Sequence, residues 1–185
     1  MVSKLRRLSF VAVLFSSLAL ANAAQAASPT AADKDTARAL MAQGTQLRDK
    51  GDSKGALESF RAADAIMRVP STGIEVAKTE VSLGQLVEAL DVALAVARLP
   101  EQPNEPKPFA IARKDAQAIA TDLEARIPSL QITLRNLPQG STPKVDVDGV
   151  AIASAALPFP RKVNPGHHVV SASAGSSRAK SEVDV

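Results

Sequence analysis

The stretch GDSKGALESF at residues 51–60 returns in altered form as GQLVEALDVA at residues 84–93. A glycine leads both copies, and the alanine and leucine at their sixth and seventh positions match. A pattern that returns after a few tens of residues indicates stacked repeats, in which each unit buries its apolar face against its neighbour. The spacing here is 33 residues, so it predicts a repeated helical hairpin.

Apolar residues recur at a spacing of three and four residues around both copies, which is typical of amphipathic helices. The predicted helices run from Asp33 to about Lys50, from Ser53 to Met67, from Ile74 to Val81 and from Leu86 to Ala97. Gly51 is expected to close the first helix in a positive-φ conformation, and Ser53 to cap the second. The sequence VPSTG at residues 69–73 is expected to break the chain between the second and third helices.

These hairpins resemble the tetratricopeptide repeat. The first unit carries the family's small and apolar positions at Gly44, Leu47, Gly51, Ala56, Phe60 and Ala63. The second keeps Ala77, Gly84 and Ala89, but has Glu80 where the family usually has a large apolar residue. The alternative is an alanine-rich helical hairpin that was duplicated by chance.

A proline-rich connector, PEQPNEPKP at residues 100–108, separates the hairpins from a fifth predicted helix. Proline lacks a backbone donor and restricts the residue before it, so this segment is expected to be exposed and semi-rigid. The fifth helix is predicted from near Lys107 to Arg126, where it would cap the array. The predicted tetratricopeptide-like helical domain thus covers residues 33–127.

The apolar period changes from helical to alternating after RIPSL at residues 126–130. Alternation continues to Arg135, again in KVDVDG, and again in the valine-rich and final segments, with turns between them. Asp148-Gly149 is a strong hairpin signal. These short segments predict a small antiparallel β-sandwich over residues 128–185, and the whole chain is therefore expected to be an α+β protein of two domains.

The β segment resembles the PEGA-type bacterial β domain, on the sequences VDVDG and PFPRKVNPGHHVVSASA. Members of that family usually carry a glycine–aromatic pair where this chain has Gly175-Ser176, and they often continue for longer. We therefore expect either that a final strand is missing or that a partner covers the edge, since an unpaired edge invites strand addition.

The first 26 residues have the layout of a secretory signal peptide. Three cations precede an apolar run of 14 residues, and Ala24 and Ala26 provide a cleavage site, with a second at Ala21-Asn22-Ala23. A transmembrane helix would need about 20 apolar residues. Cleavage lowers Lys+Arg from 22 to 19, equal to the 19 Asp+Glu, so the mature chain has no net charge and a nucleic-acid partner is not expected.

No catalytic, cofactor or metal signature is present in the sequence. The chain has no cysteine, which excludes disulfides and thiolate zinc sites. His167 and His168 are adjacent on a predicted strand and so point to opposite faces, which disfavours a shared metal. Asp146 and Asp148 lack the further oxygen ligands of a calcium loop and are expected to face outward.

The resemblance to tetratricopeptide arrays implies a partner-binding groove lined by the first helix of each pair. The residues at those positions are Arg38, Met41, Thr45, Arg48 and Lys78. Their cations could hold a carboxylate or an acidic peptide. The alternative is that they are ordinary solvated side chains of helices.

We therefore expect an exported, non-enzymatic protein of the bacterial envelope, periplasmic or envelope-associated, that acts as an interaction or scaffold module for a protein or peptide partner. No cofactor, nucleic acid or membrane span in the mature chain is expected. The alternative function is a module that binds cell-wall glycan or surface polysaccharide through the β domain.

Overall fold

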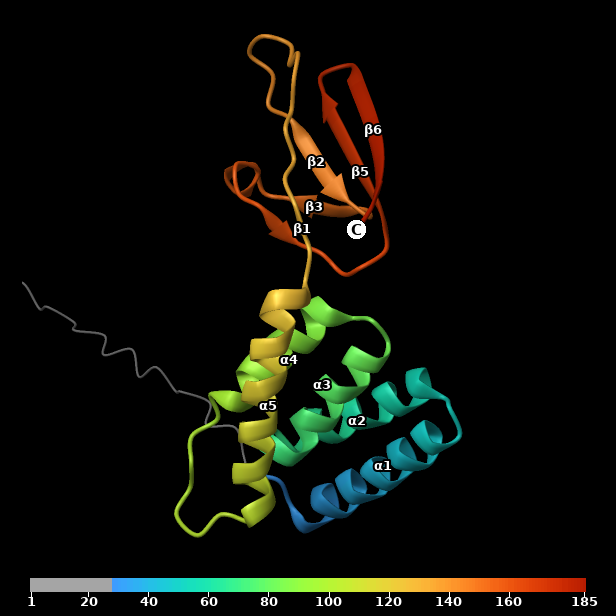
Figure 1. Ribbon diagram of the computed structural model, residues 1–185. Helices are drawn as coiled ribbons and strands as arrows, with labels where there is room; N and C mark the ends of the chain where they lie inside the picture. Colours follow the sequence, from blue (N-terminus) through green and yellow to red (C-terminus); the bar gives the residue numbers. More distant parts are fainter. Residues whose placement is uncertain (1–27) are drawn as a thin grey trace, which may run out of the picture.

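The structure is a computed structural model, and it describes residues 28–185. Five helices form one body and short strands form a second body stacked on it (Figure 1). This confirms the α+β layout of two domains. The helices are α1 (Ala31–Asp49), α2 (Ser53–Met67), α3 (Pro70–Ser82), α4 (Leu86–Ala97) and α5 (Lys107–Arg126). The predicted signal peptide lies outside the described residues. No helix among residues 28–185 has the length and apolarity needed to cross a membrane.

The helix boundaries correct the sequence analysis at two places. Asp52, not Ser53, caps α2, because its carboxylate accepts a hydrogen bond from the Gly55 amide at 2.9 Å. The VPSTG stretch does not break the chain along its whole length. α2 ends at Met67, Arg68 adopts a left-handed conformation, and α3 already begins at Pro70. Proline suits the first turn of a helix, since the amide it lacks would have no partner there.

The predicted glycine turn is confirmed, and α1 and α2 also pack closely together. Gly51 has a φ of 83° between α1 and α2. Further along α1, Gly44 lies under Phe60, and a Cβ atom at Gly44 would stand 2.6 Å from the ring. The side chain of Phe60 is fully buried as a result, in a cluster with Ala56, Leu57 and Val76. A second cluster of apolar residues lies between α3, α4 and α5.

The β domain contains two antiparallel sheets. The larger sheet has the order β3-β2-β5-β6, and β1 pairs only with β4. The strands are β1 (Ser129–Leu130), β2 (Lys144–Val147), β3 (Val150–Ile152), β4 (Arg161–Lys162), β5 (His167–Ala174) and β6 (Ser177–Asp184), with a short 3-10 turn at Ser154–Ala156. Asp148 and Gly149 both have positive φ between β2 and β3, as the predicted hairpin turn requires.

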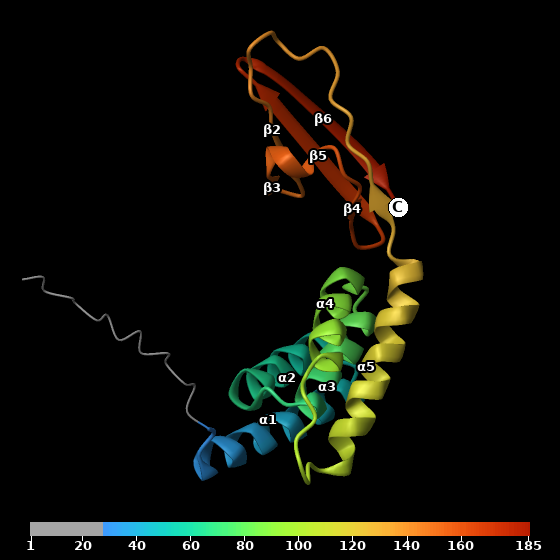
Figure 2. The ribbon, with the colours of Figure 1, turned by 90° about the vertical axis from the view of Figure 1, so that its left-hand side faces the viewer.

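The strand predicted to continue to Arg135 is wrong beyond Leu130. Residues 131–137 make no backbone–backbone hydrogen bond to the rest of the described chain. They cross the face of the larger sheet instead, and Figure 2 shows this segment beside β6 and β5. Alternation identified the apolar side chains that face the sheet here, but alternation alone does not supply a neighbouring strand for the backbone to pair with.

Candidate functional site

The first turn of α1 is held by a capping box, which sets where the predicted groove residues lie along the helix. The Thr30 hydroxyl accepts from the Asp33 amide at 3.2 Å, and the Asp33 carboxylate accepts from the Thr30 amide at 2.9 Å. The hydrogen bond from the Thr30 side chain also lowers the pKa of Asp33. A negative charge in the first turn is favourable at the positive end of the helix dipole.

The structure places the five predicted groove residues in two separate pairs and leaves Thr45 in neither pair. Arg38, Met41, Thr45 and Arg48 lie on α1, and Lys78 lies on α3. Arg48 and Lys78 meet at one carboxylate, whereas Arg38 and Met41 line a cavity further along α1. The Thr45 hydroxyl donates to the Met41 carbonyl at 3.0 Å, within the helix.

Arg48 and Lys78 belong to a chain of ion pairs across three helices. Arg48 lies 2.5 Å from Glu75 of α3, and its guanidinium also stands over the Phe60 ring at 5.5 Å from the centroid. Lys78 lies 3.8 Å from Glu75 and 3.3 Å from Asp115 of α5. Each cation therefore already faces a carboxylate. A carboxylate ligand at this end of the groove would have to compete with Glu75 and Asp115.

The other end of the groove is an open apolar cavity of about 480 Å³ between α1, the α2–α3 junction and the start of α5. Its lining residues are Lys34, Ala37, Arg38, Met41, Met67, Val69, Ser71, Thr72, Pro106 and Phe109. The large apolar side chains of this lining are half-buried. Two of them are methionines, whose flexible thioethers adapt to differently shaped ligands.

Sequence reasoning missed the residues that complete this cavity. Met67, Val69 and Phe109 were not expected to line a binding site: the second predicted helix ended at Met67, and Val69 belonged to the predicted break. All three lie where a helix ends or begins beside a proline, Pro70 or Pro106. The sequence signal that could have identified them is a large apolar residue close to a proline at a helix end. Such a residue extends beyond the packed part of the helical bundle, so its side chain can line a cavity.

Asn164 of the β domain caps a helix of the helical domain. Its side-chain oxygen accepts from the Val87 amide at 2.8 Å, and its side-chain amide donates to Glu88 at 2.8 Å. The residue at the N-cap position of α4, Gln85, makes no capping bond of its own. The first turn of α4 therefore takes its cap from a loop that is 77 residues later in the sequence.

His168 holds the Asn164 loop in place. One ring nitrogen lies 2.6 Å from Asp148 and the other lies 2.6 Å from the Asn164 carbonyl oxygen. Both neighbours are acceptors, so the ring donates from both nitrogens as the imidazolium. Asp148 also accepts from the Val169 amide at 2.8 Å. Asp148 is exposed, as expected, and its carboxylate also belongs to this network. His167 lies apart on the exposed side, 2.9 Å from Asp184.

We expect Asn164→Ala to lower the free energy of unfolding by about 0.5–2 kcal/mol, because it removes a helix cap. It should also separate the motions of the two domains. Chemical denaturation measures the first effect, and NMR relaxation of backbone amides measures the second. Asn164→Asp keeps an acceptor for the Val87 amide but places a second carboxylate beside Glu88. A loss of less than about 0.5 kcal/mol in Asn164→Ala would contradict the capping role.

The hydrogen bonds by which His168 holds the Asn164 loop should weaken at alkaline pH. The pKa of His168 is raised above its ordinary 6.5, mainly by the hydrogen bond to Asp148 and then by the Asn164 carbonyl. Stabilisation by the charged ring is therefore complete below about pH 6.5 and is lost as the pH rises through the folded-state pKa. The pKa of Asp148 is lowered from 3.8, mainly by His168, so its contribution is lost only as the pH falls through that lower value.

Thermal unfolding between pH 5 and pH 9, with NMR titration of the two histidines, measures this dependence. His168→Gln should remove the alkaline loss of stability. A His168 signal that titrates below the ordinary value, or a variant that retains the same pH dependence, would contradict the assignment.

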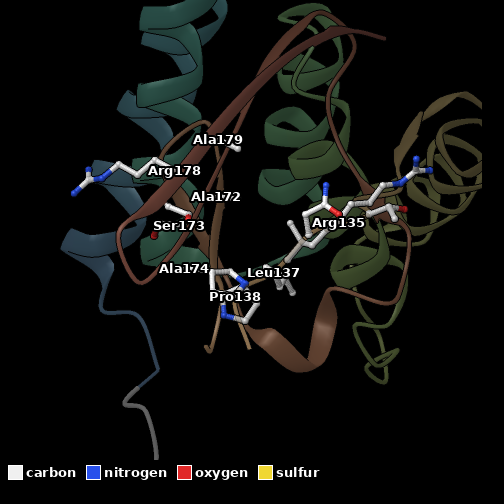
Figure 3. Close-up of a pocket in the computed structure, with 13 residues that line it drawn as sticks. Arg135, Leu137, Pro138, Ala172, Ser173, Ala174, Arg178 and Ala179 are labelled. Atoms are coloured by element: carbon white, nitrogen blue, oxygen red, sulfur yellow. The ribbon is translucent and has the colours of Figure 1, made fainter. Parts of the chain in front are cut away.

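The β domain has cavities under the segment 131–138. Figure 3 shows one of them, about 190 Å³, between Leu137 and Pro138 on one side and the end of the β5–β6 hairpin on the other. A neighbouring cavity of about 520 Å³ lies under Ile132 and Leu134. The sheet contributes small side chains here, among them Ala172 and Ala179, so the segment and the sheet are not fully packed against each other.

Among residues 28–185, no group of three or more His, Asp or Glu side chains is arranged to hold a metal ion. Comparison of the chain with protein-family models, with curated proteins and with solved structures found no match.

Proposed function

We propose that this chain is an exported interaction or scaffold protein of the bacterial envelope, without enzymatic activity of its own, and that its helical domain binds a protein partner. The observation that carries the proposal is the open apolar cavity beside α1, which is large enough to receive a partner's side chains. A concave apolar lining with a few polar groups at its edge is the usual form of a binding site.

The lining indicates the chemistry of the partner. Met41, Met67 and Phe109 offer apolar surface, and Lys34 and Arg38 stand beside it on the exposed side of α1. Arg38 pairs with Asp35 on the same helix, but both side chains are largely exposed. An exposed ion pair contributes little, so Arg38 can turn to a partner's carboxylate at small cost. We therefore propose a partner segment with an apolar anchor followed by an acidic residue.

Capture of the partner by variants of the full chain tests this proposal. We expect Phe109→Glu and Met41→Glu each to reduce recovery of the partner from an envelope extract by about tenfold or more, since both bury a charge in the apolar contact. Ile111→Glu is the matched control, because Ile111 lies on the same helix, is 60% exposed and does not line the cavity. Circular dichroism verifies that all three variants keep their helices. Equal recovery by all three would contradict the proposal.

Export has a separate test. The mass of the chain purified from the envelope fraction should correspond to cleavage after Ala26, with Ala27 at the new N-terminus. An uncleaved chain that stays in the cytosol would contradict export, whatever the result of the capture experiment.

The alternative, a polysaccharide-binding module, gives a different outcome. Full-length mature protein would then sediment with purified wall material, and Phe109→Glu would not change the amount bound. Such a result would move the binding site to the β domain and would contradict binding through the helical cavity.

A further inference from the structure

Among residues 28–185, β6 is an edge strand with no strand paired to its outer side. It ends the order β3-β2-β5-β6, and Figure 1 shows it at the margin of the β domain. Gly166 and Val185 exchange two backbone hydrogen bonds, of 2.8 and 3.0 Å. In an antiparallel ladder such pairs alternate with pairs that exchange none. The residues of β6 that turn their backbone N–H and C=O groups away from β5 are therefore Arg178, Lys180, Glu182 and Asp184.

The same four residues are charged, and their charges are segregated along the strand. The two cations occupy the first half of β6 and the two carboxylates occupy the second half, and all four side chains are exposed. Edge strands usually carry charges that prevent pairing with other strands. This arrangement differs, because a strand with opposite charges in its two halves complements a second copy of itself that runs in the opposite direction.

Only one register satisfies both the backbone and the charges. When two copies of β6 run antiparallel about Ser181, Arg178 lies opposite Asp184 of the second copy, and Lys180 lies opposite its Glu182. All of these residues have outward-facing backbone groups, so each opposed pair can exchange two hydrogen bonds. A shift by two residues would place Lys180 opposite Lys180 or Glu182 opposite Glu182, and like charges directly opposite each other are destabilising.

We propose that β6 pairs with β6 of a second copy of this chain, which joins the two four-stranded sheets into one continuous sheet. The two-fold axis passes through Ser181. Because the strands run in opposite directions, the two helical domains lie at opposite ends of the joined sheet and do not obstruct each other. Such a dimer presents two partner-binding cavities, so it can bind a partner with two sites more tightly than a monomer can.

Charge reversal on the mature full-length chain tests the register. We expect K180E to place Glu opposite Glu182 of the second copy, and E182K to place Lys opposite Lys180. Each variant creates two like-charge pairs per dimer, so the dissociation constant should rise by about tenfold or more, measured by sedimentation equilibrium. K162E is the control, because Lys162 is exposed on β4 and lies outside the interface.

Charge restoration and cysteine cross-linking separate a lost interface from a damaged fold. The double variant K180E/E182K restores opposite charges and should dimerise again, and a mixture of K180E with E182K should form a heterodimer. S181C should form a disulfide-linked dimer on mild oxidation, because the chain has no other cysteine and Ser181 faces its own copy across the axis. A179C should not, because Ala179 faces Val183 in this register.

Three results would overturn the proposal. The first is a wild-type chain that stays monomeric at all concentrations and an S181C variant that does not cross-link. The second is a dimer that K180E and E182K leave intact, which would place the interface elsewhere. The third is an S181C variant that cross-links only to a different protein in an envelope extract, which would show that the edge receives another partner.

Discussion

Replacing Phe60 with alanine is expected to lower the free energy of unfolding by about 3–5 kcal/mol. The Phe60 side chain has no exposed surface and fills the space between α1 and α2, directly over Gly44. Truncation leaves a cavity that the two helices cannot close without shifting the turn at Gly51. Chemical denaturation followed by circular dichroism at the helix band measures the loss, and Ile111→Ala on the exposed side of α5 should change stability by no more than about 0.5 kcal/mol.

Gly44 provides an independent check on this packing. Gly44→Ala places a methyl group 2.6 Å from the ring and is expected to destabilise the wild-type protein by about 1–3 kcal/mol. In the Phe60→Ala background the same change should cost much less, because the new methyl group enters the space that the ring has left. Additive effects of the two substitutions would contradict the close contact between these residues.

The sequence predicted most of the helical architecture because the helices depend on local signals. The glycine turn at Gly51, the proline-rich connector and the span of α5 all follow from residues close in sequence. The assignment of Ser53 as the cap was wrong by one residue, since Asp and Ser are both strong caps and only the structure shows which side chain turns back to the amides. The start of α3 was misplaced because Pro70, taken as part of a break, begins that helix.

The contacts that connect distant segments were not predictable in this way. Nothing near α4 indicates that Asn164 caps it, because the two segments are 77 residues apart in the sequence. The pairing of Arg48 with Glu75 likewise depends on how α1 lies against α3. The groove residues were predicted from a family resemblance, and the structure adds that all three of their cations already pair with carboxylates within the domain. Their role in binding an acidic partner stays a prediction.

The register of β6 is an intermediate case. Its alternating sequence predicted a final strand, but the direction of each backbone group follows from the observed pairing with β5. This pairing must be known before the order of charges along β6, basic and then acidic, can predict pairing with a second copy. Strand β1 is shorter than its sequence predicts. Apolar and polar residues alternate to Arg135, but only Ser129 and Leu130 pair with another strand.

Replacing Glu80 with leucine is expected to stabilise the protein. Glu80 is 1% exposed, so its carboxylate lies inside the helical domain. One of its oxygens accepts from Arg61 at 2.7 Å, and the other has no hydrogen-bond partner in the described chain. A buried carboxylate with an unsatisfied oxygen is costly. The Arg61 side chain is 51% exposed, so it can be hydrated once Glu80 is gone. We expect a gain of about 1–3 kcal/mol, the cost of leaving a buried oxygen unsatisfied.

The pH dependence of stability gives a second measurement of the same effect. Burial raises the pKa of Glu80 above its ordinary 4.5, against the opposing effect of the Arg61 hydrogen bond. The folded state therefore holds this proton more tightly than the unfolded state, so stability falls as the pH rises from about 4.5 through the folded-state pKa. Glu80→Leu should remove that fall, and the gain in stability should be larger at pH 7 than at pH 4.

The exposed Glu58 of α2 supplies the matched control, since Glu58→Leu removes the same charge without relieving any burial. It should change stability by no more than about 0.5 kcal/mol at either pH. A loss of stability in Glu80→Leu at pH 7 would show that the ion pair with Arg61 outweighs the desolvation of the carboxylate. The ion pair would then be a source of stability for the helical domain, because it joins α2 to α3.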